Sequence, residues 1–153
     1  MEQYQKAFTL ALARNDAQAI GDCGYDLAVA QLADNHPDAA LATALVTRDA
    51  LAARSAPGFA ELDLAQAAAL HRLGRDPEAD ILAAQAQNTA NDPATIVQAS
   101  YVRGLIAYDR GDQAGLVAAL DRFVPPAATR KIPADWEANH DELTARLLSL
   151  IHI

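Results

Sequence analysis

The chain has 153 residues, of which 52% are hydrophobic and 5% aromatic, and about a quarter of them are Ala. This length and composition suit a single domain with a buried core and exclude a disordered chain. The formal net charge of −8 argues against nucleic acid or anionic lipid as the principal partner, because both attract clustered Lys and Arg. Ala is the strongest helix former, and no stretch alternates polar and apolar residues as a strand does. The sequence therefore predicts an all-α protein.

The N-terminal stretch "MEQYQKAFTLALARNDAQ" is apolar only in part, since Thr9 and Arg14 interrupt it. It is too short and too broken for a signal peptide or a membrane anchor. We therefore expect a cytoplasmic protein without membrane insertion, and we leave open a targeting segment removed from the chain. The single cysteine, Cys23, cannot form a disulfide within the chain and is expected to be a small buried residue.

Breaks that combine a helix stop with a helix start recur along the chain. Gly or Asn can take the left-handed conformation that ends a helix, and Asp or Pro can begin the next helix. Such breaks occur at "NHPD", "SAPG", "GRDPE", "NDP", "GD" and "PPAATRKIP". They predict helices over residues 3–14, 22–34, 38–54, 59–73, 77–90, 94–110, 113–123 and 135–151. The start of the second helix is the least clear, because Gly21 and Gly24 interrupt its pattern.

Three of these turns recur at a nearly constant interval. Asn35, Gly74 and Gly111 lie 39 and 37 residues apart, and each separates two predicted helices. Small residues stand seven positions before each turn, where they would let the two helices cross closely: Ala28, Ala67 and Gly104. This spacing predicts a repeated helical hairpin.

The unit "VQASYVRGLIAYDRGDQAGLVAALDRF" resembles the tetratricopeptide repeat (TPR), a helix-turn-helix unit of about 34 residues. Gly104, Tyr108, Gly111 and Leu116 carry the resemblance here, and a second unit begins "AELDLAQAAALHRLGRDPEAD". The match covers roughly residues 21–124. It departs from the family in its longer period and in lacking the early tryptophan and the usual large turn residue.

The resemblance implies a single domain, residues 1–153, of antiparallel helical hairpins stacked as a TPR-like right-handed α-solenoid. The hairpins would span about 21–54, 59–90 and 94–124. An N-terminal helix over 3–14 would precede them, and a C-terminal capping helix over 135–151 would follow. A plain antiparallel bundle is the alternative architecture.

The residues that could support chemistry are scattered. His36, His71, His140 and His152 lack the close spacing that metal ligands usually have on one element. No glycine-rich phosphate loop and no nucleophile elbow is visible. We therefore expect no enzyme, no catalytic residue, no metal and no cofactor. The alternative is a small all-α enzyme, or an accessory domain of one, with a pocket of dispersed Asp, Glu, His and Tyr.

In the family, the first helix of each hairpin lines a concave side that receives an extended peptide or a partner helix. The resemblance thus implies a non-catalytic protein–protein interaction or scaffolding module that binds a protein or peptide. The predicted partner-binding residues are Tyr25, Val29, Leu64, His71, Arg72, Tyr101, Leu105 and Tyr108. The alternative for the tyrosines is packing between adjacent hairpins.

The C-terminal stretch "DWEANHDELTARLLSLIHI" has one apolar stripe suited to covering the last hairpin. Leu148, Leu150 and Ile153 add apolar surface elsewhere, where the end of a solenoid is normally polar. They predict an oligomer interface or a continuation of the protein. A structural unit that dimerises through this helix is therefore a further alternative function.

Overall fold

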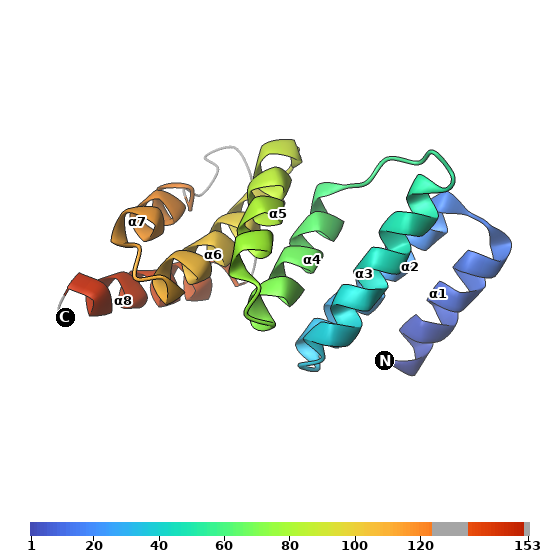
Figure 1. The fold of residues 1–153 in the computed structure, drawn as a ribbon, viewed down its shortest axis with the longest axis horizontal. Helices are drawn as coiled ribbons and strands as arrows, with labels where there is room; N and C mark the ends of the chain where they lie inside the picture. The colour runs from blue at the N-terminus through green and yellow to red at the C-terminus, as the bar shows by residue number, and fades with distance from the viewer. Residues whose placement is uncertain (124–134, 152–153) are drawn as a thin grey trace.

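The computed structural model describes residues 1–123 and 135–151 (Figure 1). Across these residues the chain forms eight helices and no strand, which confirms the all-α prediction. The helices are α1 (Glu2–Arg14), α2 (Ala17–Ala33), α3 (Pro37–Ala52), α4 (Ala60–Arg72), α5 (Asp76–Thr89), α6 (Pro93–Asp109), α7 (Gln113–Asp121) and α8 (Trp136–Ile151). None of these eight is both long and apolar enough to cross a membrane. The predicted break at 125–133, His152 and Ile153 lie outside the described residues.

Local capping explains most helix ends. The Asp92 side chain accepts a hydrogen bond from the Thr95 amide at 2.8 Å, and the Asp112 side chain accepts one from the Gly115 amide at 2.9 Å. These bonds satisfy amides that have no partner within the first helical turn. At the turns, Asn35, Gly74 and Gly111 have positive φ values of 60°, 73° and 67°, as a left-handed helix stop requires.

The predicted start of the second helix is wrong. Helix α2 begins at Ala17 and continues through Gly21 and Gly24, because Asp16 caps it by accepting a hydrogen bond from the Ala19 amide at 3.2 Å. Gly24 serves close packing and does not interrupt the helix. A Cβ atom there would lie 2.9 Å from the Cβ of Thr47 on α3, so the absence of a side chain lets the two helices approach.

Each helix packs against the next one along the chain, from α1 to α8. In addition, α2 contacts α4, α4 contacts α6 and α6 contacts α8. Figure 1 shows the resulting elongated row, which runs from α1 at the right to α8 at the left. The even-numbered helices thus follow one another directly, and the predicted binding residues all lie on three of them.

The core is built largely from Ala. Ala28, Ala67 and Ala83 are fully buried on α2, α4 and α5, and their small side chains let the helix axes approach closely. Leu143 of α8 is likewise fully buried; it fills the space over Gly104 of α6, where an added Cβ would lie 2.7 Å from the Leu143 Cδ1 atom. Small residues on even-numbered helices therefore set how closely these helices pack.

Candidate partner-binding surface

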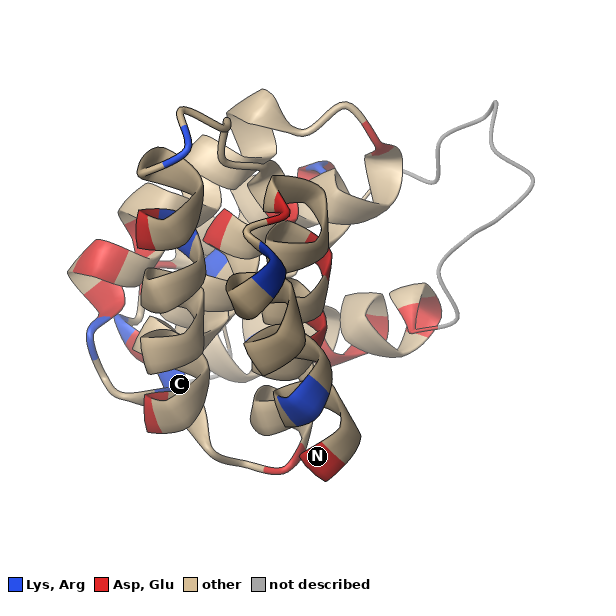
Figure 2. Ribbon diagram, turned by 90° about the vertical axis from the view of Figure 1, so that its right-hand side faces the viewer, with Lys and Arg blue, Asp and Glu red and all other residues tan. Residues whose placement is uncertain are grey.

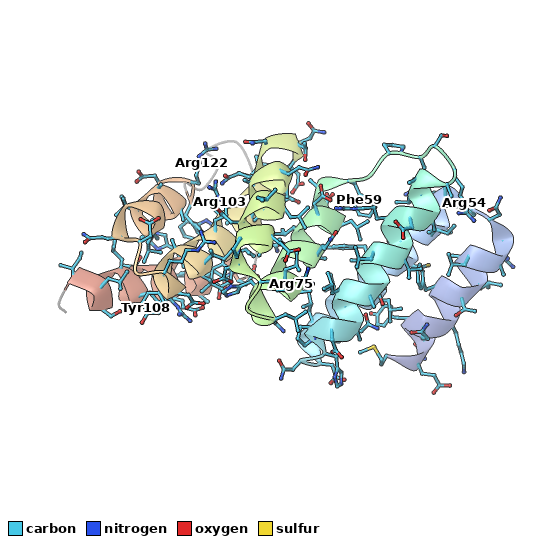
Figure 3. All side chains as sticks on the ribbon, in the orientation of Figure 1. Arg54, Phe59, Arg75, Arg103, Tyr108 and Arg122 are labelled. Carbon is cyan, nitrogen blue, oxygen red and sulfur yellow. The ribbon has the colours of Figure 1, made fainter. Side chains whose placement is uncertain are left out.

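On α2, both predicted binding residues reach the surface. Val29 is 41% exposed, whereas Tyr25 is half-buried. The Tyr25 ring packs edge to face against the ring of Phe59, with the centroids 6.2 Å apart and the planes at 71°. Phe59 immediately precedes α4 (Figure 3), so this aromatic pair joins the first and second predicted hairpins.

On α4, Leu64 is only 7% exposed and packs in the central core. The prediction that Leu64 faces a partner is therefore wrong. The physical reason is the central place of α4, which contacts α2, α3, α5 and α6 and so has little free surface. A helical stripe chosen by spacing alone does not distinguish a solvent-facing position from one covered by a neighbouring helix.

His71 and Arg72, at the end of α4, hold neighbouring elements together. The Nδ1 atom of His71 lies 2.8 Å from Oδ1 of Asp76, and its Nε2 atom lies 3.8 Å from Oδ2 of Asp109. The Arg72 guanidinium donates a hydrogen bond to the main-chain carbonyl of Leu32, at the end of α2. These two predicted partner-binding residues are thus engaged within the protein.

On α6, the predicted binding face lies against α8. The hydroxyl of Tyr101 donates a hydrogen bond of 2.5 Å to Oε2 of Glu142, and the Arg146 guanidinium lies over the Tyr108 ring, 4.8 Å from its centroid. Leu105 packs in the same apolar cluster. Burial and the bond to Glu142 raise the pKa of Tyr101 to about 12. Tyr101 and Tyr108 thus pack against the C-terminal helix, whereas the alternative left open by the sequence was packing between adjacent hairpins.

The predicted oligomer residues on α8 differ in exposure. Leu148 is 50% exposed, whereas Leu150 is half-buried against the C-terminal core cluster. Ile151, on the same helix, is 52% exposed. The third predicted residue, Ile153, lies outside the described part of the chain. An apolar strip of Leu148 and Ile151 therefore remains on the surface of α8.

A hollow of about 470 Å³ opens where α2, the end of α3 and the start of α4 meet. We call it the aromatic hollow. Its lining combines apolar walls, two carboxylates and two glycines: Ala17, Gln18, Gly21, Asp22, Tyr25, Leu51, Ala56, Pro57, Gly58, Phe59 and Glu61. The side-chain amide of Gln18 donates to both carboxylate oxygens of Asp22, at 3.0 and 3.1 Å, and thereby orients this acid at the hollow.

A second, more polar hollow of about 760 Å³ adjoins the first. We call it the polar hollow. It shares Gly58, Phe59 and Glu61 with the aromatic hollow and extends to the end of α5 and the start of α6: Arg48, Ala60, Asp63, Gln85, Thr89, Ala90, Asn91 and Asp92 complete its lining. The two hollows lie next to each other and share these three lining residues, and we call them together the depression around Phe59.

Acidic groups dominate the electrostatics of this depression. Burial raises the pKa of the Tyr25 hydroxyl, and the nearby carboxylates of Glu61, Asp26 and Asp92 raise it further. Burial also raises the pKa of Asp63, although contact with Arg48 acts in the opposite direction. Elsewhere the charges are mixed, and on the face in Figure 2 the basic residues stand singly among acidic ones. The depression is thus a locally negative part of a mixed surface.

Sequence reasoning did not find Phe59 as a binding residue. The signal was a large aromatic residue directly after the "SAPG" break, where a helix start normally carries Ser, Thr, Asp or Asn. Phe59 occupies the position before α4 without a side-chain cap. Its ring instead packs against Tyr25 and lines both hollows.

A three-residue cluster of metal-ligand types was also missed. His71, Asp76 and Asp109 bring one potential donor atom each to within 4.8 Å of one another. They come from the end of α4, the start of α5 and the end of α6, so no spacing along one helix reveals them. The hydrogen bond between His71 Nδ1 and Asp76 leaves only Nε2 and Asp109 facing each other, and these two donors make an incomplete ligand set.

Comparison of the chain with protein-family models, with curated proteins and with solved structures gives no match. The choice of site therefore depends on geometry alone. The depression around Phe59 is lined by half-buried aromatic side chains and by acidic and amide side chains, and its lining comes from α2, α3, α4, α5 and the loops before α4 and α6. It includes Tyr25 from the predicted set and lies at the far side of α4 from Tyr108 (Figure 3).

Proposed function

We propose that the protein is a non-catalytic interaction module that binds a peptide segment of a partner protein. The observation that carries this proposal is the depression around Phe59, made of two adjoining hollows that share three lining residues. It is open to solvent, and its apolar and polar linings lie side by side. Such a combination suits an extended peptide, because its side chains need apolar pockets and its main-chain amides need hydrogen-bonding partners.

The architecture that presents this surface is, in the same proposal, a short solenoid of TPR-like hairpins. The pairs α2–α3, α4–α5 and α6–α7 would be the repeats, and α8 would cap the last one. Support comes from the contacts of α2 with α4, of α4 with α6 and of α6 with α8, since stacked repeats contact each other through equivalent helices. The binding surface would then lie between the first two repeats.

Support for a peptide also comes from the polar hollow. Gln85, Thr89, Asn91 and Asp92 line it, and their amide, hydroxyl and carboxylate groups can hydrogen-bond a main chain. Most of the walls belong to packed helices, so little ordering of these parts would accompany binding. A preformed site of this kind binds without a large entropic cost.

Selection from a random peptide library displayed on phage tests the proposal. The full chain should enrich a family of related sequences. A Glu61→Arg variant should lose them, because Glu61 lines both hollows. Asp49→Arg makes the same change of charge at an exposed position of α3 and should retain them. Failure of the wild-type chain to enrich any sequence would overturn the proposal, provided that circular dichroism shows all three proteins equally helical.

A second candidate function is self-assembly through α8. Leu148 and Ile151 support it, since both are at least half-exposed on one helix and apolar side chains gathered on a surface are often interfaces. In this case the protein would act as a structural unit, with a second copy covering the strip.

A further inference from the structure

We propose that the aromatic hollow is a receptor for a basic side chain, Lys or Arg, of the bound peptide. This inference rests on the proposed function and adds the chemistry of the partner. Asp22 of α2 and Glu61 of α4 reach the hollow from two sides. Among the described residues that line it there is no Lys and no Arg, so the two carboxylates have no cation within the lining itself.

The walls of the hollow match the aliphatic stem of such a side chain. Leu51, Pro57 and the rings of Tyr25 and Phe59 provide apolar surface around the two acids. Lys and Arg bury their methylene groups on apolar surface and keep the charged end near polar partners. Aromatic rings add attraction for the charge, because the face of a ring is electron-rich.

The carboxylates are placed to meet the charged end. Gln18 orients Asp22 through two hydrogen bonds, and each carboxylate oxygen can still accept a further bond. Glu61 lies in the first turn of α4, where the positive end of the helix dipole favours a negative charge. Both acids line the same hollow, and in the proposal each can form a charge-assisted hydrogen bond with the guanidinium or ammonium group.

The surroundings oppose an acidic ligand. Asp26 and Asp92 lie close enough to Tyr25 to act on its hydroxyl together with Glu61, so the potential around the hollow is negative. The basic residue of the adjoining polar hollow, Arg48, is paired with Asp63. A peptide that places a basic side chain in the aromatic hollow and its main chain in the polar hollow satisfies both linings.

A titration followed by NMR tests the hollow without any peptide. The full chain, labelled with ¹⁵N, is titrated with butylguanidinium and with butylammonium, which represent the Arg and Lys side chains. Valeramide and valerate are the neutral and anionic probes of similar size. We expect saturable shifts of the Gly21 and Gly58 amide signals with the two cations, and much weaker shifts with the other two. The cation that binds with the higher affinity identifies the preferred side chain.

Matched variants assign the effect to the carboxylates. Asp22→Asn and Glu61→Gln should each weaken cation binding about threefold, and the double variant about tenfold, as expected for partly exposed charge pairs. Asp49→Asn removes one charge from exposed α3 surface and should leave the affinity unchanged. Binding should also weaken as salt is added, because salt screens the attraction.

The outcomes separate this inference from the proposed function. Three outcomes of the titration would overturn the basic-side-chain receptor. The shifts could be as large with valeramide as with the cations, or the Gly21 and Gly58 signals could show no saturable shift. The Asp49→Asn variant could also lose as much cation affinity as the Asp22→Asn and Glu61→Gln variants. Phage selection that enriches peptides without a recurrent Lys or Arg would overturn it too, while the peptide-binding function would stand. An absence of enriched peptides would instead overturn the function, whatever the cation titration shows.

Discussion

The Tyr101 hydroxyl donates a hydrogen bond of 2.5 Å to Glu142, which joins α6 to α8 across 41 positions of sequence. Arg146, one turn further along α8, donates to the same carboxylate at 2.7 Å and lies over the Tyr108 ring. These contacts fix α8 on the face of α6 that the sequence assigned to a partner. This face is therefore a part of the fold whose contribution to stability can be measured.

We expect Tyr101→Phe to lower the free energy of unfolding by about 1 kcal/mol, because it removes one hydrogen bond to a charged group that retains Arg146 as a partner. Urea denaturation followed by circular dichroism measures the change. Tyr4→Phe is the matched control, since Tyr4 is 45% exposed on α1. Equal stability of the two variants would contradict the assigned role of the Tyr101 hydroxyl.

The same hydroxyl predicts a loss of stability at alkaline pH. Burial and Glu142 raise the pKa of Tyr101 from 10.0 to about 12 in the folded protein. In this interval the unfolded chain releases the proton and the folded protein keeps it, so the stabilisation is complete below pH 10 and is lost as the pH rises to about 12. The stability difference between wild type and Tyr101→Phe should shrink over this interval. A stability difference that stays constant over this pH interval would contradict a raised pKa of Tyr101 in the folded protein.

Gly24→Ala should destabilise the protein by about 1–3 kcal/mol, because the new methyl group would collide with Thr47 on α3. Gly58→Ala is the control, since nothing lies within 4 Å of a Cβ at that position. Adding Thr47→Ala should restore part of the stability of Gly24→Ala in a double-mutant cycle. If Gly24→Ala proves as stable as wild type, the close approach of α2 and α3 is wrong.

Arg48→Met should destabilise the protein by about 1–2 kcal/mol at neutral pH, because it leaves the Asp63 carboxylate without its cation. The Asp63 side chain is only 11% exposed. Burial already raises its pKa above the ordinary value of 3.8, and loss of Arg48 should raise it further. The cost should therefore shrink as the pH falls through the raised pKa of Asp63, and it should be absent by pH 3.8, where the folded protein binds this proton with or without Arg48. Urea denaturation at acid and neutral pH measures the cost at each pH. A cost that is the same at both would contradict its assignment to the Asp63 charge.

Self-assembly through α8 predicts a solution mass twice that of one chain, measured by light scattering after size exclusion. Leu148→Glu should return the mass to that of one chain, because it places a charge in the apolar strip. Leu45→Glu is the control at a similarly exposed Leu of α3, 42% exposed against 50% for Leu148. A wild-type mass of one chain would exclude this second candidate function.

The helices could be predicted from the sequence because their signals are local. Asp92, Gly74 and Gly111 act through main-chain groups a few residues away, and such short-range chemistry can be recognised without knowledge of the fold. Gly24 misled the prediction for the opposite reason. Its role depends on Thr47, a residue of another helix.

The candidate site could be predicted only in part. Helical periodicity determines which residues share a face, and Tyr25, chosen in this way, lines the aromatic hollow. Periodicity does not determine which neighbour covers that face. Leu64 is therefore buried under adjoining helices, and Tyr101 lies against α8. Phe59 was missed because its importance comes from the meeting of α2, α3 and α4 around one loop.

The depression around Phe59 is lined by successive helices in a row in which each helix contacts mainly its near neighbours. In such rows the terminal helices open at a lower free energy than the middle of the stack. A ligand held by both α2 and α4 would have to leave before α1–α3 could detach. Binding would therefore raise the free energy needed to open the N-terminal end of the row. We expect ligand binding to slow hydrogen exchange in α1–α3 and to change it less in α7.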